Sequence, residues 1–158
     1  MAQKVNPSEL HRVVVACIIH NRTHAADEPR FLLLKRHPEH KVYPGLWGVP
    51  SGGIELSDFA DPHADPLETA ARRETREESG LEVGILSYLS AFRFVRPDGI
   101  PVIGMRFYAP YLGGSVVLDT KQDATEFVWS TAAEAKRRPL LPDLADELAE
   151  VRARLVGR

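Results

Sequence analysis

Residues 72–81 read RRETREESGL. Glu74, Glu77 and Glu78 stand at positions i, i+3 and i+4, so a helix through this stretch would place three carboxylates on one face as immediate neighbours. Gly80 is the residue type that ends a helix in a left-handed conformation. The acids would then lie in the last turns, where the helix dipole favours cations instead. Each like-charge pair costs roughly 0.2–0.5 kcal/mol, so the arrangement needs an explanation.

Two explanations of the acidic cluster are open. Three carboxylates held on one helix face offer the oxygen ligands that Mg²⁺ prefers, and Mg²⁺ commonly combines one or two protein carboxylates with substrate phosphates. Arg73 could then hold one carboxylate in orientation. Alternatively, the stretch is a solvated helix face on which Arg72 and Arg76 pair with the glutamates.

The residues before this stretch predict where the helix begins. Asp65 is a plausible N-cap, with Pro66 at the first helical position and Glu68 placed for a capping box. An apolar stripe then follows at helical spacing, formed by Leu67, Ala70 and Ala71. We therefore expect a helix from about residue 65 to residue 79.

The remaining chain alternates strand patterns with turns. We expect strands over 11–20, 31–36, 81–95, 100–112 and 125–130, the first two as a hairpin-like pair, and an amphipathic helix over 144–155. The segment 37–55 is rich in proline and glycine and should be loop or short strand. This order predicts an α/β (α+β) fold, in which a mixed β-sheet carries helices on its faces.

Composition narrows the function classes. The chain has 158 residues, is 44% hydrophobic and has a formal net charge of −2, which fits one domain over 1–158 with its core at about 11–157. The cations are spread out, which argues against a nucleic-acid polymer as partner and leaves a small phosphorylated ligand open. A single buried-looking cysteine, Cys17, excludes an internal disulfide. No apolar run is long enough to span a membrane, so we expect a cytoplasmic protein.

The wider context resembles the signature of the Nudix hydrolases. RETREESGL (73–81) matches the fixed Arg-Glu, Glu-Glu and Gly positions of that signature, and GLWGVPSGGIE (45–55) and EFVW (126–129) are similar to its flanks. Three departures are present. The acid expected five residues after Gly52 is Asp58, but Asp65 has the right distance to Arg73, so we interpret 58–64 as an inserted loop. Thr75 replaces an aliphatic residue, and Ser51 replaces a glycine.

The resemblance implies an α/β/α sandwich and an activity. It implies that Glu74, Glu77, Glu78 and the main-chain carbonyl of Ser51 bind Mg²⁺, with Mn²⁺ as a possible substitute, and that Arg73 orients them. The expected reaction is attack of water on a phosphorus of a diphosphate linkage in a nucleoside triphosphate or an ADP-ribose-like substrate. The alternative is a catalytically silent nucleotide-binding module with the same fold.

Further candidates surround this expected site. Lys35 and Arg36 could bind substrate phosphates, and the glycine loop at Gly52 could approach the ligand closely. Trp47 could stack on a base, although a tryptophan near such a loop is more often a core residue. Asp123 and Glu126 are the candidates for a general base, with Glu126 preferred. The histidines receive no role, and the resemblance also implies a possible homodimer.

Overall fold

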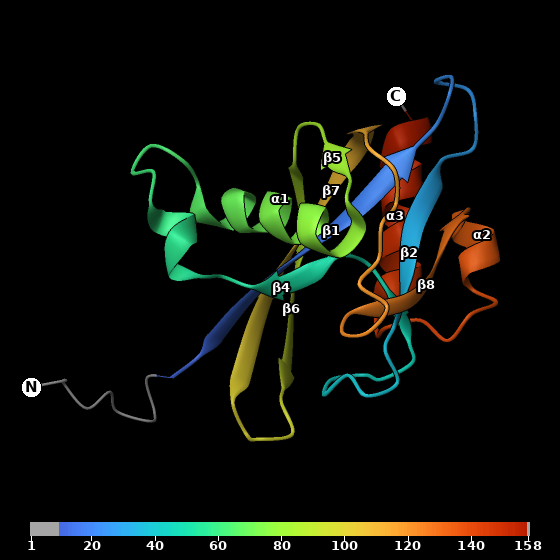
Figure 1. Ribbon diagram of the computed structural model, residues 1–158. Coiled ribbons are helices and arrows are strands. Elements are labelled where there is room, and N and C mark those ends of the chain that lie inside the picture. Colours follow the sequence, from blue (N-terminus) through green and yellow to red (C-terminus); the bar gives the residue numbers. More distant parts are fainter. Residues whose placement is uncertain (1–9, 158) are drawn as a thin grey trace, which may run out of the picture.

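The computed structural model describes residues 10–157 of the chain (Figure 1). Its strands are β1 (Arg12–Asn21), β2 (Arg30–Arg36), β3 (Trp47–Gly48), β4 (Ser51–Gly53), β5 (Glu82–Val83), β6 (Ser87–Val95), β7 (Pro101–Gly113) and β8 (Ala124–Ser130). Its α-helices are α1 (Pro66–Ser79), α2 (Ala132–Ala135) and α3 (Leu144–Val156), and a 3-10 helix spans Leu56–Phe59.

The strands form one mixed sheet, as the sequence predicts. β1 runs parallel to β7 and antiparallel to β2 and β4. β8 extends the sheet beyond β2, and β6 pairs with β7 to form a long hairpin that reaches past the helices (Figure 1). α1 and α3 pack on opposite faces of this sheet, so the fold is an α+β sandwich.

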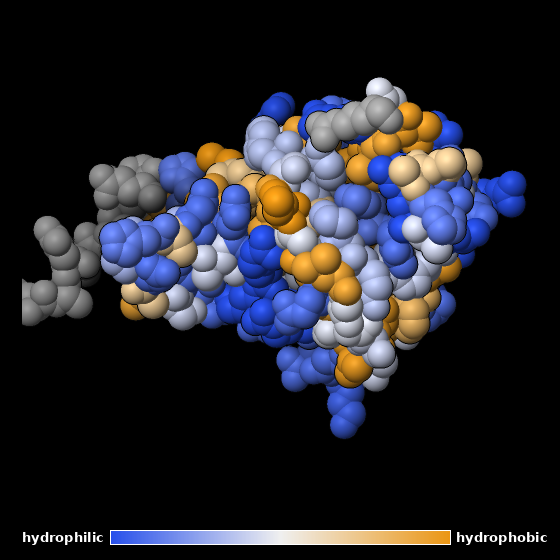
Figure 2. Space-filling view, turned by 90° about the horizontal axis from the view of Figure 1, so that it is seen from above, coloured by the Kyte–Doolittle hydropathy of each residue, from blue (hydrophilic) through white to orange (hydrophobic). Residues whose placement is uncertain are grey.

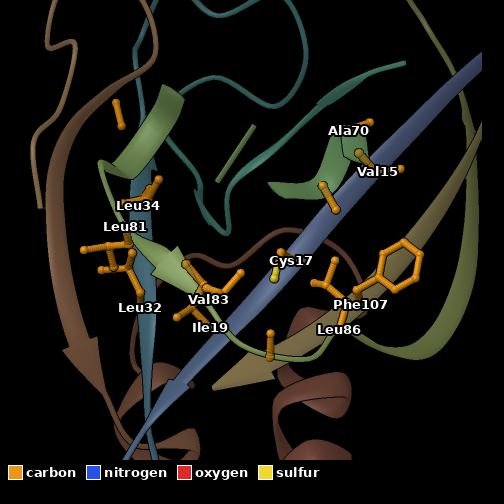
Figure 3. Close-up of a cluster of buried hydrophobic side chains, with 13 residues drawn as sticks. Val15, Cys17, Ile19, Leu32, Leu34, Ala70, Leu81, Val83, Leu86 and Phe107 are labelled. Carbon is orange, nitrogen blue, oxygen red and sulfur yellow. The ribbon is translucent and has the colours of Figure 1, made fainter. Parts of the chain in front are cut away.

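Each face of the sheet has its own apolar core, because successive residues of a strand point to opposite sides. On the α1 face, Val15, Cys17 and Ile19 of β1 pack with Ala70 and Ala71 (Figure 3). On the α3 face, the intervening residues of β1 join a second core, which includes Ala16, Ile18, Leu144, Leu148 and Val151. The uninterrupted apolar pattern of β1 is therefore explained by burial on both sides.

Both ends of α1 follow from local chemistry. The Asp65 carboxylate accepts hydrogen bonds from the backbone N–H groups of Leu67, at 2.8 Å, and Glu68, at 3.4 Å. Gly80 ends the helix with φ 74°, a conformation that only glycine adopts without strain. The N-cap and the C-terminal glycine are thus confirmed, whereas the side chain of Glu68 does not complete a capping box.

Two expectations about strands need correction. The segment 81–95 is not one strand, because β5 and β6 pair with separate parts of β7 and residues 84–86 bend between them. The predicted hairpin of β1 and β2 is paired only at its closed end, at His20–Phe31 and Asn21–Arg30. Nearer the start of β1, residues 51–53 of β4 pair with β1 instead of β2. A glycine-rich strand therefore lies in the sheet beside α1.

Hydrophilic residues cover most of the face seen in Figure 2, and hydrophobic residues appear there as small separate patches. Within residues 10–157, no helix is both long and apolar enough to cross a membrane.

Candidate active site

The acidic cluster begins where α1 meets β4. A Cβ atom at Gly52 would lie only 2.1 Å from Cδ of Glu74, so the Glu74 carboxylate occupies the space that any other residue would fill. A glycine at this position therefore allows the strand and the helix to approach each other closely. The sequence assigned Gly52 to ligand binding, but its immediate neighbour is this carboxylate.

Arg73 lies at the centre of the cluster. Its Nη1 atom donates to Glu74 Oε1 at 2.7 Å and to Glu77 Oε2 at 3.1 Å, and its Nη2 atom donates to the carbonyl of Gly53 at 2.9 Å. One guanidinium thus fixes two signature glutamates and ties them to β4. This geometry fits the orienting role that the resemblance implies for Arg73.

Asp58 also binds Arg73, which changes the interpretation of the insertion. Its carboxylate accepts from Nε at 3.0 Å and from Nη2 at 2.9 Å, and it is 2% exposed. The Arg73 hydrogen bonds hold the pKa of Asp58 below its usual value. Asp58 is the one buried residue of the 3-10 helix, so the extra residues between this helix and α1 are those after Phe59, and not 58–64 as expected.

Glu78 is turned toward the start of β4. Its Oε2 atom accepts from the backbone N–H of Ser51 at 3.3 Å. Burial raises the pKa of Glu78 to about 8, and the nearby charge of Glu74 acts in the same direction. Burial likewise raises the pKa of Glu74, even though Arg73 opposes the shift. Burial therefore outweighs the nearby positive charge, which comes from Arg73 for Glu74 and from Arg36 for Glu78.

The alternative explanation of a solvated, mixed-charge helix face does not hold. Arg72 donates to the carbonyls of Val83, at 2.8 Å, and Gly84, at 2.9 Å, beyond the end of the helix. Arg76 pairs with Glu82 at 2.7 Å. Neither arginine pairs with the three glutamates. Among the residues that the structure describes, Glu74 and Glu77 share Arg73 as their ion-pair partner, and Glu78 has no ion pair within 4.0 Å.

A small polar cavity continues from Glu78 and Ser51. Arg36, His40 and Asp123 line it together with these two residues. Arg36 donates to Ser51 Oγ at 3.3 Å and to the carbonyl of Val42 at 2.9 Å, which fixes its guanidinium beside β4. Burial, and then the charge of Asp119, raises the pKa of Asp123. Arg36 and Asp123 are therefore both brought to the acidic cluster.

Lys35 and Glu126 are not part of this cavity. Leu34 packs in the core on the α1 face and Leu33 in the core on the α3 face, so the alternation along β2 directs Lys35 away from α1. Lys35 Nζ pairs with Glu126 Oε1 of the neighbouring strand β8 at 2.6 Å. The structure thus does not bring Glu126, the preferred base, or Lys35, the expected phosphate ligand, to the cavity beside Glu78.

Trp47 does not suit a stacking role either. It is 8% exposed and packs in the core on the α3 face, with the Arg138 guanidinium 5.2 Å from its ring centroid. Its ring is already covered by protein. The ring therefore lies in the core, which the sequence already indicated as the more common role of such a tryptophan.

The cluster has the donor chemistry of a hard divalent cation, with carboxylate oxygens and a main-chain carbonyl. In the described part of the chain, no three His, Cys, Asp or Glu side chains converge as around a bound ion. The reason is visible in the contacts, because Arg73 Nη1 lies between Glu74 and Glu77. The raised pKa values of Glu74 and Glu78 indicate that added positive charge would be stabilising, so the residues fit such an ion.

Sequence reasoning missed two members of this region. His40 lines the cavity and its Nδ1 atom lies 3.2 Å from Arg36 Nη1, but a histidine in a polar loop gives no sequence signal for such a position. Asp58 could have been found, because it stands at the signature distance from Gly52. It was rejected because the spacing between Asp58 and Arg73 is longer than the signature allows, whereas Asp65 has the expected spacing.

Comparison with known proteins agrees with this geometry. The model of the NUDIX domain matches residues 10–155. An NAD-capped RNA hydrolase NudC from Photobacterium profundum is 31% identical over 103 residues, which are 65% of this chain and 34% of the relative. The nucleoside triphosphatase NudI of Klebsiella pneumoniae is 28% identical over 140 residues, 82% of this chain and 88% of the relative. The chain thus spans about a third of the length of NudC.

Solved structures share the fold. The NUDIX domain of Shewanella oneidensis NrtR, crystallised with ADP ribose, superposes with a TM-score of 0.73 at 19% identity, covering 96% of this chain and 94% of that one. A MutT NUDIX hydrolase from Burkholderia pseudomallei gives 0.69 at 23% identity, covering 90% and 99%. With its matching domain model, its shared fold and the glutamates of α1 gathered on Arg73, this chain belongs to the Nudix family.

Proposed function

We propose that this Nudix domain hydrolyses a diphosphate linkage in a nucleoside diphosphate derivative, with water attacking phosphorus and Mg²⁺ required. The observation that carries the proposal is the excess of acid over base around Arg73, which contacts Asp58, Glu74 and Glu77 within 3.1 Å. A surface that only packs gains nothing from such repulsion. The relatives named for nucleoside triphosphates and NAD-capped RNA support nucleotide derivatives as the substrate class.

Glu74, Glu77, Glu78 and the carbonyl of Ser51 are the groups that would hold the cation, and Mn²⁺ could replace Mg²⁺. A bound divalent cation would supply compensation for phosphate charge and a lower pKa for bound water. Without it, the carboxylates of α1 and the anionic substrate repel each other.

The protein's own residues have separate tasks in this proposal. Arg73 keeps Glu74 and Glu77 in orientation, and Arg36 binds a non-bridging phosphate oxygen beside Ser51. Asp123 accepts the proton of the attacking water, because it lines the same cavity as Glu78 whereas Glu126 lies on the other face of the sheet.

A nucleotide-binding module without turnover is the second candidate. One observation favours it, namely that Arg73 Nη1 occupies the position between Glu74 and Glu77. In that case the guanidinium would neutralise the acids permanently, and the protein would bind a nucleotide without a cation.

The test is hydrolysis of nucleoside triphosphates, ADP-ribose and nucleotide sugars, assayed with Mg²⁺, with Mn²⁺ and with a chelator. We expect turnover of at least one compound only with the cation. Glu77→Gln should lower it at least about a hundredfold, since disturbing even a partner of a metal ligand costs about 10–100-fold. Glu82→Gln is the matched control, because Glu82 is an exposed acid paired with Arg76, and it should retain full activity.

Two results would overturn the proposal. Tight nucleotide binding without any product, unaffected by Glu77→Gln, would identify the silent module. Equal turnover with and without the cation would remove the role assigned to the glutamates.

A further inference from the structure

Two turns lie side by side where β2 pairs with β8, one over residues 37–40 and the other just before β8. The backbone N–H of His37 donates to the carbonyl of Asp123 at 3.0 Å, and the N–H of His40 donates to the carbonyl of His37 at 2.9 Å. Backbone hydrogen bonds thus join His40 and Asp123 in one small framework. Both side chains are half-buried, and both line the polar cavity of the proposed active site.

The ring of His40 is held through one of its two nitrogen atoms. Arg36 Nη1 and the backbone N–H of Val42 both approach His40 Nδ1, each at 3.2 Å. The carbonyl of Val42 also lies 2.9 Å from Nδ1, but it already accepts a hydrogen bond from Arg36 Nη1 at 2.9 Å. Because two N–H groups converge on Nδ1, this atom is the acceptor, and a neutral His40 carries its proton on Nε2.

The surroundings of His40 keep its ring neutral. A second proton would have to bind at Nδ1, beside the guanidinium of Arg36. Burial, and then the charge of Arg36, lowers the pKa of His40 accordingly. Within residues 10–157, the hydrogen bonds of this ring are all made at Nδ1. The N–H group at Nε2, on the other side of the ring from Arg36, is therefore a free donor in a cavity lined by acids.

Asp123 is the carboxylate in this cavity that lacks a donor. Burial raises the pKa of Asp123, and the negative charges of Asp119 and Glu77 act in the same direction. Asp123 in turn contributes to the raised pKa of Glu78. Among these neighbours, His40 alone lowers the pKa of Asp123. A hydrogen bond to a carboxylate favours its charged form, so a donor at Nε2 would keep Asp123 in the state that a general base requires.

We propose that His40 is a positioning residue for the general base. Its Nε2–H group donates to one carboxylate oxygen of Asp123, directly or through one water molecule, and leaves the other oxygen free for the attacking water. Arg36 holds the ring in place by donating to Nδ1. Such hydrogen bonds are often long in an unliganded protein and tighten when the substrate binds. The role rests on the proposed function, but the position of the proton and the coupling of His40 with Asp123 require neither a cation nor turnover.

Two NMR measurements on the protein with a chelator present test the coupling. Long-range nitrogen–proton correlations should show His40 as a neutral ring protonated on Nε2, and a proton on Nδ1 would overturn the proposal. A carbon-detected titration should then show that His40→Leu raises the pKa of Asp123 by about one pH unit, the size expected for one lost hydrogen bond. His40→Gln should largely preserve the pKa of Asp123, because its amide nitrogen takes the place of Nε2. An unchanged pKa in His40→Leu would also overturn the proposal.

Kinetics provide the functional arm of the experiment. His40→Leu should lower kcat about tenfold with little change in KM, and the acid limb of the kcat profile should move to higher pH, because the base is positioned less well and protonates more easily. His40→Gln should restore most of kcat. His63→Leu is the matched control, because His63 is an exposed histidine in the segment before α1. If His40→Leu does not fold, the position of the proton still decides the question. Coupling of His40 with Asp123 without any turnover would refute only the proposed function.

Discussion

Two arginines are held by carboxylates on opposite faces of the sheet, and their surroundings differ. Arg106, on the α3 face, is 4% exposed and has one acidic partner, Glu147, which Ser90 Oγ also binds at 2.6 Å. Arg73, on the α1 face, has Asp58, Glu74 and Glu77 within 3.1 Å and Glu55 at 3.7 Å. The first group balances one charge against one, whereas the second has an excess of negative charge.

The two arginines show how a charged group that only stabilises the fold differs from one that belongs to the proposed active site. A balanced buried pair can be exchanged for apolar residues of similar size with little loss of stability. An acidic excess cannot be removed without removing the cation affinity that it creates. The number of acids per base around a buried guanidinium therefore indicates which of the two regions is the active site in this proposal.

The largest expected effect concerns the balanced pair. Arg106→Met leaves Glu147 buried without its cation, and it should lower the free energy of unfolding by about 3–5 kcal/mol, measured by urea titration. Adding Glu147→Leu should recover most of that loss, because no buried charge then remains. If the double variant is as unstable as the single one, the pair is not merely structural and the comparison fails.

The two faces should also differ in their response to acid. His20 is 8% exposed, and burial lowers its pKa from 6.5 to about 4, with the charge of Arg22 as a smaller cause. The unfolded chain therefore binds a proton near pH 6.5 that the folded chain takes up only near pH 4. Stability should fall by up to about 3 kcal/mol as the pH decreases between these values.

His20→Gln removes this titration, so its free energy of unfolding should change less between pH 6.5 and pH 4 than that of the unaltered protein. Urea titrations at four or five pH values would measure both slopes. Identical slopes would mean that other groups dominate the acid response of this region.

The α1 region was the more predictable of the two from sequence. Helix spacing, the Asp65 cap and the glycine at the end of α1 are local features, so the residues themselves define the helix and the face on which Glu74, Glu77 and Glu78 lie. The pairing of β1 with both β2 and β4 depends on distant residues, and only its apolar pattern was visible.

The errors have a common physical origin. The choice between Asp123 and Glu126 depends on where β8 begins, because Asp123 lies in the turn before the strand and Glu126 lies within it. A register shift in the pairing of β2 with β8, at Lys35 and Arg36, makes simple counting unreliable there. The hollow lined by Phe92 and Phe94 was missed for a similar reason. The alternation in SAFRFV shows that Phe92 and Phe94 share a face, but not that the face borders a hollow.

A substitution at Asp58 tests the acidic region directly, and its expected effect on turnover is of intermediate size. Asp58→Asn keeps the shape of the side chain but weakens its two hydrogen bonds with Arg73, which then holds Glu74 and Glu77 less firmly. We expect turnover to fall about 10–100-fold, as for other groups that orient metal ligands. Asp61→Asn, in the exposed segment before α1, is the control and should change nothing. Equal activity of both variants would show that Arg73 needs no support from the 3-10 helix.

The smallest expected effect on stability comes from the neighbouring glycines of β4, whose missing side chains point to opposite faces of the strand. Gly52→Ala would place a methyl group 2.1 Å from Cδ of Glu74, so the carboxylate must move, whereas Gly53→Ala meets Arg12 Nη2 at 2.3 Å, the free end of a flexible side chain. Both should cost about 1 kcal/mol of stability. Only Gly52→Ala should also abolish cation-dependent turnover, because it displaces a proposed ligand. Gly113→Ala is the control for the unfolding and activity assays, because its new methyl group has open space around it and should change neither result. Equal activity losses in the first two variants would show that β4 does not divide an acidic functional face from a structural one.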